Sequence, residues 1–255
     1  MKKAGIILTL GFITVLLVAV GLVWSALDAQ FSQGSVASIL PIATDQPVTA
    51  ASTSAPTPTP TPTPVALPAT AQLTVPFTSQ APLAIWDDTH ENTCEEASFL
   101  MVKYFLDGTA LPDKNTVDSQ LQDMVNWETQ RVYGPSITMT QLNTVVKQEY
   151  GLTTGKVIKN ITINDIKQQI AAGNPVILGM AGKLLDNPNF KDGGPNYHAL
   201  VVIGYDATGF ITNDPGTKNG QNFHYDYTAF YSAIHDWNPT NILDGGKDML
   251  VFSQS

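Results

Sequence analysis

The 255-residue sequence contains a single cysteine, Cys94, and only 13 lysine and arginine residues against 22 aspartate and glutamate residues. One cysteine excludes a disulfide framework, which needs paired thiols, and a cysteine-type structural zinc site, which needs several. The net charge of −9 and the lack of a basic cluster argue against a nucleic-acid partner, because affinity for phosphate backbones depends largely on lysine and arginine.

Charged residues are absent between positions 4 and 27. As a helix this apolar run would span roughly 36 Å, which is enough to cross a bilayer. Lys2 and Lys3 precede it, so the positive-inside bias places the rest of the chain outside the cytoplasm. A cleaved signal peptide is the alternative, although Leu27-Asp28-Ala29 is a poor cleavage site. We expect residues 1–27 to anchor the chain in the cell membrane, or the protein to be secreted if the segment is cleaved.

Residues 28–71 contain eight of the 17 prolines amid serine, threonine and alanine, a composition that cannot build a core. Alternating Pro-Thr from Pro56 to Pro64 favours an extended, polyproline-like chain. We therefore expect a disordered Pro/Thr-rich linker over 28–71 and one folded domain over 72–255. The whole net charge falls in that domain, which favours encounter with a basic or neutral target over an anionic one.

Apolar residues recur at helical intervals early in this domain, and strand-like runs follow later. The helical spacing predicts a helix that opens at Cys94, and further helices over Thr116–Gln130, Thr138–Tyr150 and Ile163–Ala172. The runs between turn residues predict strands over Leu73–Phe77, Pro175–Met180, His198–Tyr205, Phe210–Asn213 and Met249–Phe252. Helices followed by strands indicate an α+β domain with N-terminal helices packed on a C-terminal antiparallel sheet.

Cys94 is a candidate nucleophile because of its place in the first helix. Thr93 and Glu96 have the spacing of a capping box, which puts Cys94 at the helix N-terminus, where the helix dipole lowers a thiol pKa. Free cysteine is also commonly a small buried hydrophobe, and Glu95 and Glu96 would oppose thiolate formation if they point at the sulfur. The cysteine alone therefore leaves a catalytic and a structural interpretation open.

His198 and Asp214 supply the partners that a nucleophilic cysteine needs. They lie on two strands that look like a hairpin, and closure of its loop by Tyr205 and Gly209 would make Asp214 a same-face neighbour of His198. A base beside a thiol, oriented by a third polar group, activates cysteine at neutral pH. Asn213 could replace Asp214 as the orienting group, although strand alternation would point it to the other face.

Two upstream residues have less specific interpretations. Gln80 lies in the loop Ser79-Gln80-Ala81-Pro82, where its amide could stabilise an oxyanion or could simply be a polar surface group. His90 lies four residues before Cys94, but a metal site needs three or four converging ligands and the sequence offers no such set. We expect no metal. The acidic, glycine-rich stretch from Asp186 to Gly194 is expected to form a mobile loop at the border of the cleft.

Several stretches of the sequence resemble the papain-fold cysteine peptidases that process bacteriocins by removing double-glycine leader peptides, and in particular their stand-alone, peptidase-like relatives. They are VPFTSQAPLAIWDDTHENTCEEASFLMVKYF, AAGNPVIL, YHALVVIGYD and ITNDPG, within residues 75–105 and 174–216. The resemblance implies a papain-like fold and a Cys-His-Asp triad with a glutamine oxyanion donor. It places these roles on Cys94, His198, Asp214 and Gln80.

The sequence thus predicts a membrane-tethered, extracytoplasmic cysteine peptidase that hydrolyses peptide or protein substrates without a cofactor and acts as a monomer. The same triad could transfer an acyl or peptidyl group to an amine instead of to water. The alternative from another class is a catalytically inactive papain-fold module that binds peptide or a cell-surface polymer. An accessible thiol of low pKa beside His198 would favour the enzyme, because a binding module has no reason to keep one.

Overall fold

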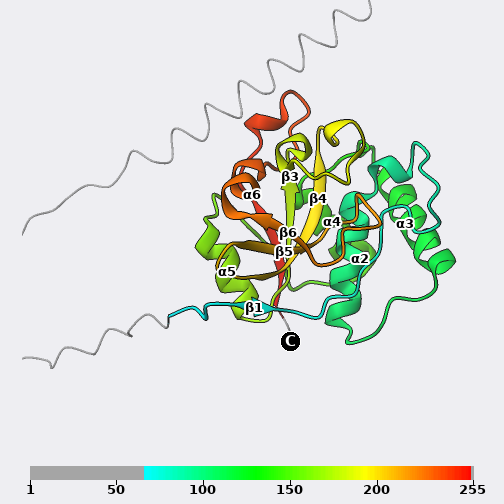
Figure 1. The fold of residues 1–255 in the computed structure, drawn as a ribbon. Coiled ribbons are helices and arrows are strands. Elements are labelled where there is room, and N and C mark those ends of the chain that lie inside the picture. The colour runs from blue at the N-terminus through cyan, green and yellow to red at the C-terminus, as the bar shows by residue number, and fades with distance from the viewer. Residues whose placement is uncertain (1–65, 254–255) are drawn as a thin grey trace, which may run out of the picture. The chain divides into compact units, whose positions relative to one another are not determined.

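An antiparallel sheet of seven strands forms the centre of residues 66–253, the part of the chain that this computed structural model describes (Figure 1). The strand order is β2-β7-β3-β4-β5-β6, and β1 pairs with the far end of β4. The strands are β1 Ala71–Gln72, β2 Gly155–Ile158, β3 Val176–Met180, β4 His198–Tyr205, β5 Gly209–Asn213, β6 Phe223–Asp226 and β7 Met249–Phe252.

Helices cover both faces of this sheet (Figure 1). One face packs against α2 Cys94–Leu106, α3 Lys114–Thr129 and α4 Met139–Glu149, and the other against α5 Ile163–Ala171 and α6 Tyr227–Ala233. Alternating strand residues divide between the two cores: Ile177 and Val201 face the first, while Leu178 and Leu200 face the second. Short 3₁₀ helices lie in the connections: η1 His90–Asn92, η2 Gly182–Leu185, η3 Lys191–Gly193 and η4 Ile242–Asp244.

The predicted α+β class is confirmed, and so are the central helices and strands to within two residues of each end. The prediction of helices packed on the sheet did not divide them between its faces; α5 and α6 cover the second face. The predicted strand Leu73–Phe77 was wrong: β1 covers only Ala71–Gln72, and beyond it the Leu73 N–H bonds the Ile203 carbonyl oxygen before the chain leaves the sheet. The sequence also gave no sign of β2, β6 or α6.

The expected membrane anchor, residues 1–27, and the linker as far as residue 65 lie outside the described residues. Within residues 66–253 none of the helices combines the length and the hydrophobicity that a bilayer crossing needs.

The β4–β5 hairpin brings two candidate site residues together through a bulge. At its loop end Tyr205 pairs with Phe210, one residue away from the predicted pairing with Gly209. The register shifts between Val202 and Gly204, after which Val201 pairs with Asn213. The shift restores the predicted alignment at the other end of the hairpin, so that Asp214 follows directly where it can reach His198.

Candidate active site

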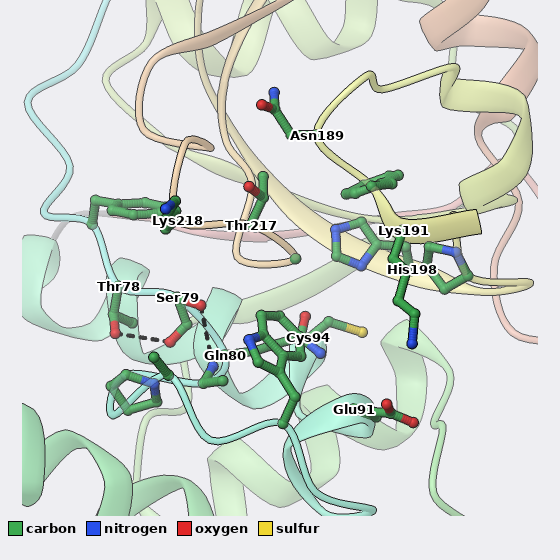
Figure 2. A pocket seen from close by; sticks show the side chains of 18 of the residues that line it. Thr78, Ser79, Gln80, Glu91, Cys94, Asn189, Lys191, His198, Thr217 and Lys218 are labelled. Atoms are coloured by element: carbon green, nitrogen blue, oxygen red, sulfur yellow. Dashed lines mark hydrogen bonds between the residues drawn. The ribbon is translucent and has the colours of Figure 1, made fainter. Parts of the chain in front are cut away.

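Cys94, His198 and Gln80 line a single cleft with a volume of about 1190 Å³ (Figure 2). Cys94 opens α2, His198 opens β4, and Gln80 lies in the loop that precedes η1. All three side chains are buried at the base of this cleft. Asp214 is fully buried behind His198, so the structure brings the four predicted site residues into one region of the fold.

The Cys94 sulfur is held by two contacts beside the start of β4. Its thiol donates a hydrogen bond to Glu95 Oε2 at 2.8 Å, and the backbone N–H of Ala199, the residue after His198, bonds the sulfur. Thr93 does not form the predicted capping box with Glu96: its hydroxyl makes no capping bond to the helix. The helix therefore begins at Cys94 without a side-chain cap.

The environment of the thiol differs from the sequence-based expectation. Burial raises the pKa of Cys94 well above its usual value, and the charge and hydrogen bond of Glu95 raise it further. The bond from Ala199 acts in the opposite direction but is the smaller influence. Glu95 points at the sulfur, which is the condition under which the sequence predicted opposition to thiolate formation. The resting group is thus a thiol, not a thiolate.

His198 and Asp214 form a closely bonded pair. His198 Nε2 lies 2.7 Å from Asp214 Oδ1, and both side chains are almost completely excluded from solvent. Burial by itself would raise the pKa of Asp214, but the positive charge of protonated His198 and hydrogen bonds from His198, Tyr225 and Gly216 outweigh burial and lower it. Asp214 is therefore ionised and fixes the imidazole with Nδ1 as its free nitrogen.

Three residues that the sequence analysis did not assign complete this pair. Tyr225 on β6 donates its hydroxyl hydrogen to Asp214 Oδ2 at 2.6 Å, and Asn187 Nδ2 donates to the same oxygen at 3.2 Å. The ring of Phe190 packs edge-on against the His198 imidazole at 5.3 Å between centroids. The predicted loop from Asp186 to Gly194 does border the cleft, and two of its residues also contact the His198–Asp214 pair.

Asn213, the alternative orienting group, points away from His198 as strand alternation predicted. Its side-chain amide donates to the carbonyl oxygens of Val75 and Pro76 at 3.0 and 3.3 Å. Asn213 thereby ties the segment before Gln80 to the end of β5, while Asp214 makes the contact with the imidazole.

Three hydrogen bonds hold Gln80 in place. Its side-chain Nε2 donates to the His90 carbonyl oxygen at 2.7 Å, and its own carbonyl oxygen accepts from the Thr93 hydroxyl at 3.0 Å. Its backbone N–H donates to the Pro215 carbonyl oxygen at 3.0 Å. Because Nε2 carries two hydrogens and His90 takes one, the second is available to another acceptor.

The carbonyl that holds Gln80 belongs to a histidine fixed between two carboxylates. His90 Nδ1 lies 2.7 Å from Asp87 Oδ1, and Nε2 lies 3.0 Å from Asp118 Oδ1 on α3. Hydrogen bonds from the His90 backbone and ring lower the pKa of Asp87. His90 thus joins the Gln80 loop to α3.

Three buried carboxyl groups lie behind Cys94 without a basic partner within residues 66–253. Burial raises the pKa of Glu95 to about 8. The side chains of Glu96 and Glu128 hydrogen-bond each other, and burial raises the pKa of Glu96 to about 7 and that of Glu128 to about 11. Glu95 Oε1 also accepts the Ile137 N–H at 2.9 Å, which connects α2 to the segment before α4. One proton or more is therefore retained in this cluster at neutral pH.

The cluster predicts that stability falls as pH rises. A carboxyl whose pKa is raised on folding stabilises the fold most below its unfolded value, and that contribution is lost as pH climbs through the folded value. When the pH is raised from 5 to 9, we expect the free energy of unfolding of Glu128→Gln to increase by at least about 1 kcal/mol relative to that of the wild type. This corresponds to roughly 2–4 °C in Tm. Thermal unfolding at both pH values measures this. Equal pH dependence in the two proteins would contradict a shared proton at Glu128.

No cluster of three or more histidine, cysteine, aspartate or glutamate side chains in residues 66–253 is arranged to hold a metal ion. The chemistry available at the cleft is that of a thiol, an imidazole bonded to a carboxylate, and an amide N–H donor.

The sequence and the fold were compared with those of known proteins. Residues 72–242 match the Peptidase_C39 like family. The fold is similar to a crystal structure described as a C39-like peptidase from Bacillus anthracis, with a TM-score of 0.50 and 17% sequence identity, over 73% of this chain and 98% of that one. No curated protein matches the chain significantly. At this identity the structural match speaks for the fold.

Proposed function

Because the chain belongs to the Peptidase_C39 like family, we propose that it is a cysteine peptidase in which Cys94 attacks a peptide carbonyl, His198 transfers the proton and Asp214 orients His198. The observation that carries this proposal is the 2.7 Å contact between His198 Nε2 and Asp214 Oδ1. It lies at the base of the cleft that Cys94 also lines. The Ala199 N–H bond to the sulfur supports a position of Cys94 next to the imidazole.

The bonding of His198 assigns its two nitrogens. Nε2 is engaged by Asp214, so Nδ1 is the nitrogen that exchanges a proton with Cys94. The sulfur forms a bond to the carbonyl carbon while Nδ1 accepts the thiol proton, and the same proton passes to the leaving amine as the C–N bond breaks. Water, deprotonated by His198, then hydrolyses the thioester and restores the thiol.

Gln80 fits the role of oxyanion donor. The free hydrogen on its Nε2 and the backbone N–H groups at the start of α2 are donors of the kind that stabilise the negative oxygen of a tetrahedral intermediate. The anchoring of Gln80 by His90, Thr93 and Pro215 supports a donor whose position is set before the substrate binds.

The raised pKa of Cys94 affects how the thiol is activated. A thiol that is protonated at neutral pH requires proton transfer to His198 during the attack, not a preformed thiolate–imidazolium pair. We propose that His198 acts as a general base in the attack step, because it is the group that can remove this proton from a site where Glu95 disfavours the thiolate.

One observation favours a second candidate, the catalytically inactive module that binds a peptide or a cell-surface polymer. The Cys94 hydrogen is directed at Glu95 Oε2, which is an arrangement that a purely structural thiol could share. The two candidates differ in whether Cys94 forms an acyl adduct. Transfer of that acyl group to an amine would be a variant of the first candidate, distinguished by its products.

The test incubates the full-length protein with a proteome-derived pool of unblocked peptides and identifies the new termini by mass spectrometry. The proposal predicts cleavage products together with an acyl adduct on the peptide containing Cys94, and neither in the Cys94→Ala protein. Products of equal amount from both proteins would overturn the peptidase proposal. Adduct and products absent from both would favour the binding module.

The location of the domain is a further part of the proposal. We propose that residues 1–27 tether the protein to the cell membrane and that the Pro/Thr-rich linker before β1 holds the catalytic domain away from its outer surface. The apolar run, the preceding Lys2 and Lys3 and the Pro/Thr-rich composition support this arrangement. This arrangement implies a peptide or protein substrate outside the cytoplasm. The net negative charge argues against a nucleic-acid partner.

A further inference from the structure

The charge of the cleft differs in sign from that of the rest of the domain. Residues 66–253 include eleven basic and twenty acidic residues. Three of the basic residues line the cleft, Lys114, Lys191 and Lys218, against two of the acidic ones, Glu91 and Asp192. Cations are therefore enriched in the cleft, where concave protein walls strengthen the field that a bound substrate experiences.

The three lysines are free to bind a ligand. Each side chain is exposed, and among the residues that the structure describes none of the three ammonium groups has an ion-pair or hydrogen-bond partner. Other lysines are differently placed: Lys103 pairs with Asp107 at 2.6 Å, and Lys247 donates to backbone carbonyl oxygens.

Two of these lysines lie on opposite sides of Cys94 (Figure 2). Lys191 begins η3 directly after Phe190, whose ring packs against His198. Lys218 lies two residues after Gly216, where an added Cβ would come within 2.8 Å of the His198 ring. A peptide with its scissile carbonyl at the Cys94 sulfur would therefore pass between the two ammonium groups.

Resting on the peptidase function proposed above, we propose that the cleft is specific for acidic peptides, with an aspartate or glutamate on each side of the scissile bond within a few residues of it. Lys191 and Lys218 recognise these carboxylates, and Lys114 extends the same preference at the start of α3. The net charge of the whole domain had favoured basic or neutral targets, whereas the cleft selects the opposite sign.

The experiment compares peptides that differ only by Glu→Gln on either side of a cleaved bond found in the peptide pool. For the full-length wild type we expect kcat/KM to be about tenfold higher for the peptide with both glutamates than for the peptide with glutamines. Each single lysine-to-glutamine substitution in the cleft should lower kcat/KM for the glutamate peptide roughly two- to fivefold. The Lys191→Gln, Lys218→Gln double variant should cleave both peptides at similar rates. Lys147→Gln, an exposed lysine on α4 outside the cleft, is the matched control and should keep the full preference.

The preference should also weaken with salt, because screening acts on exposed charge pairs. Equal rates for the two wild-type peptides, or a preference that survives in the double variant, would overturn the proposal. The Cys94→Ala protein separates this from failure of the peptidase function: binding of the same labelled peptides, measured by fluorescence anisotropy, needs the lysines but no chemistry. Equal affinity for the glutamate and glutamine peptides would again contradict acidic specificity.

Discussion

His198→Ala is expected to lower kcat/KM for peptide hydrolysis by about 10³-fold or more, to the level of the Cys94→Ala protein. The thiol is buried and its pKa is raised, so attack on a carbonyl depends on a base that removes its proton. His198 is the base that Asp214 orients at the cleft. Because thiol and base act as one unit, the double variant should lose no more than either single variant.

A matched control for this prediction is His224→Ala. His224 lies on β6, its side chain is 40% exposed, and its contacts are with Asp206 and Thr208 at the surface. We expect its kcat/KM to stay within about twofold of the wild type, as for other exposed substitutions. A His198→Ala protein that keeps more than about a tenth of wild-type activity would contradict the role of His198 as base.

Gln80→Ala is expected to lower kcat for peptide hydrolysis by about 10²–10³-fold, with little change in the rate at which iodoacetamide alkylates Cys94. Attack on a carbonyl places negative charge on an oxygen, which Gln80 is positioned to bind. Displacement of iodide creates no such oxyanion, so alkylation reports the thiol alone. A parallel loss in both reactions would show instead that Gln80 supports the structure around Cys94.

Asp118→Asn examines the same donor from outside the cleft. Asp118 holds His90 at 3.0 Å, and the His90 carbonyl oxygen in turn accepts from Gln80. A displaced donor should cost about tenfold in kcat. In the Gln80→Ala background the same substitution should cost little further activity, because its effect passes through Gln80. Additive losses would place the influence of Asp118 elsewhere.

Regular periodicity accounts for the parts of the fold that the sequence predicted. The helices α3, α4 and α5 and the strands β3, β4, β5 and β7 have strong apolar patterns between clear turn residues. The missed strand Gly155–Ile158 is short and half exposed, and the segment from Phe223 to Ala233 mixes aromatic and polar residues without a regular period. The bulge between Val202 and Gly204 depends on pairing between strands, which local sequence does not determine.

The order of the site residues was readable from the sequence, but their surroundings were not. A helix start indicated Cys94, a strand start indicated His198, and the end of the next strand indicated Asp214. The Cys94 thiol donates a hydrogen bond to Glu95, and the Ala199 N–H bonds the sulfur. The Thr93 hydroxyl donates to the Gln80 carbonyl oxygen and does not cap the helix. The contacts of Ala199 with Cys94 and of Thr93 with Gln80 join separate segments of the chain, so no local spacing rule predicts them.

The role of Asn187 and Tyr225 illustrates the same limit. Both donate to Asp214 from segments 27 and 11 residues away, and the sequence analysis considered the first only as part of a loop at the cleft border. Their polarity is unremarkable until the hairpin places Asp214 between them. The burial of Asp214 could be expected from its partner His198, but the number of its donors could not.

The rate of Cys94 alkylation across pH 5–10, in the wild type and in His198→Ala, measures whether His198 activates Cys94. Burial and Glu95 raise the pKa of Cys94, so a thiol without help from His198 should react more slowly at pH 7 than an ordinary free cysteine. We expect the wild type to be labelled at pH 7 at least about tenfold faster than His198→Ala, because His198 removes the thiol proton during the reaction. Equally slow labelling of both proteins, with the same alkaline midpoint, would contradict it.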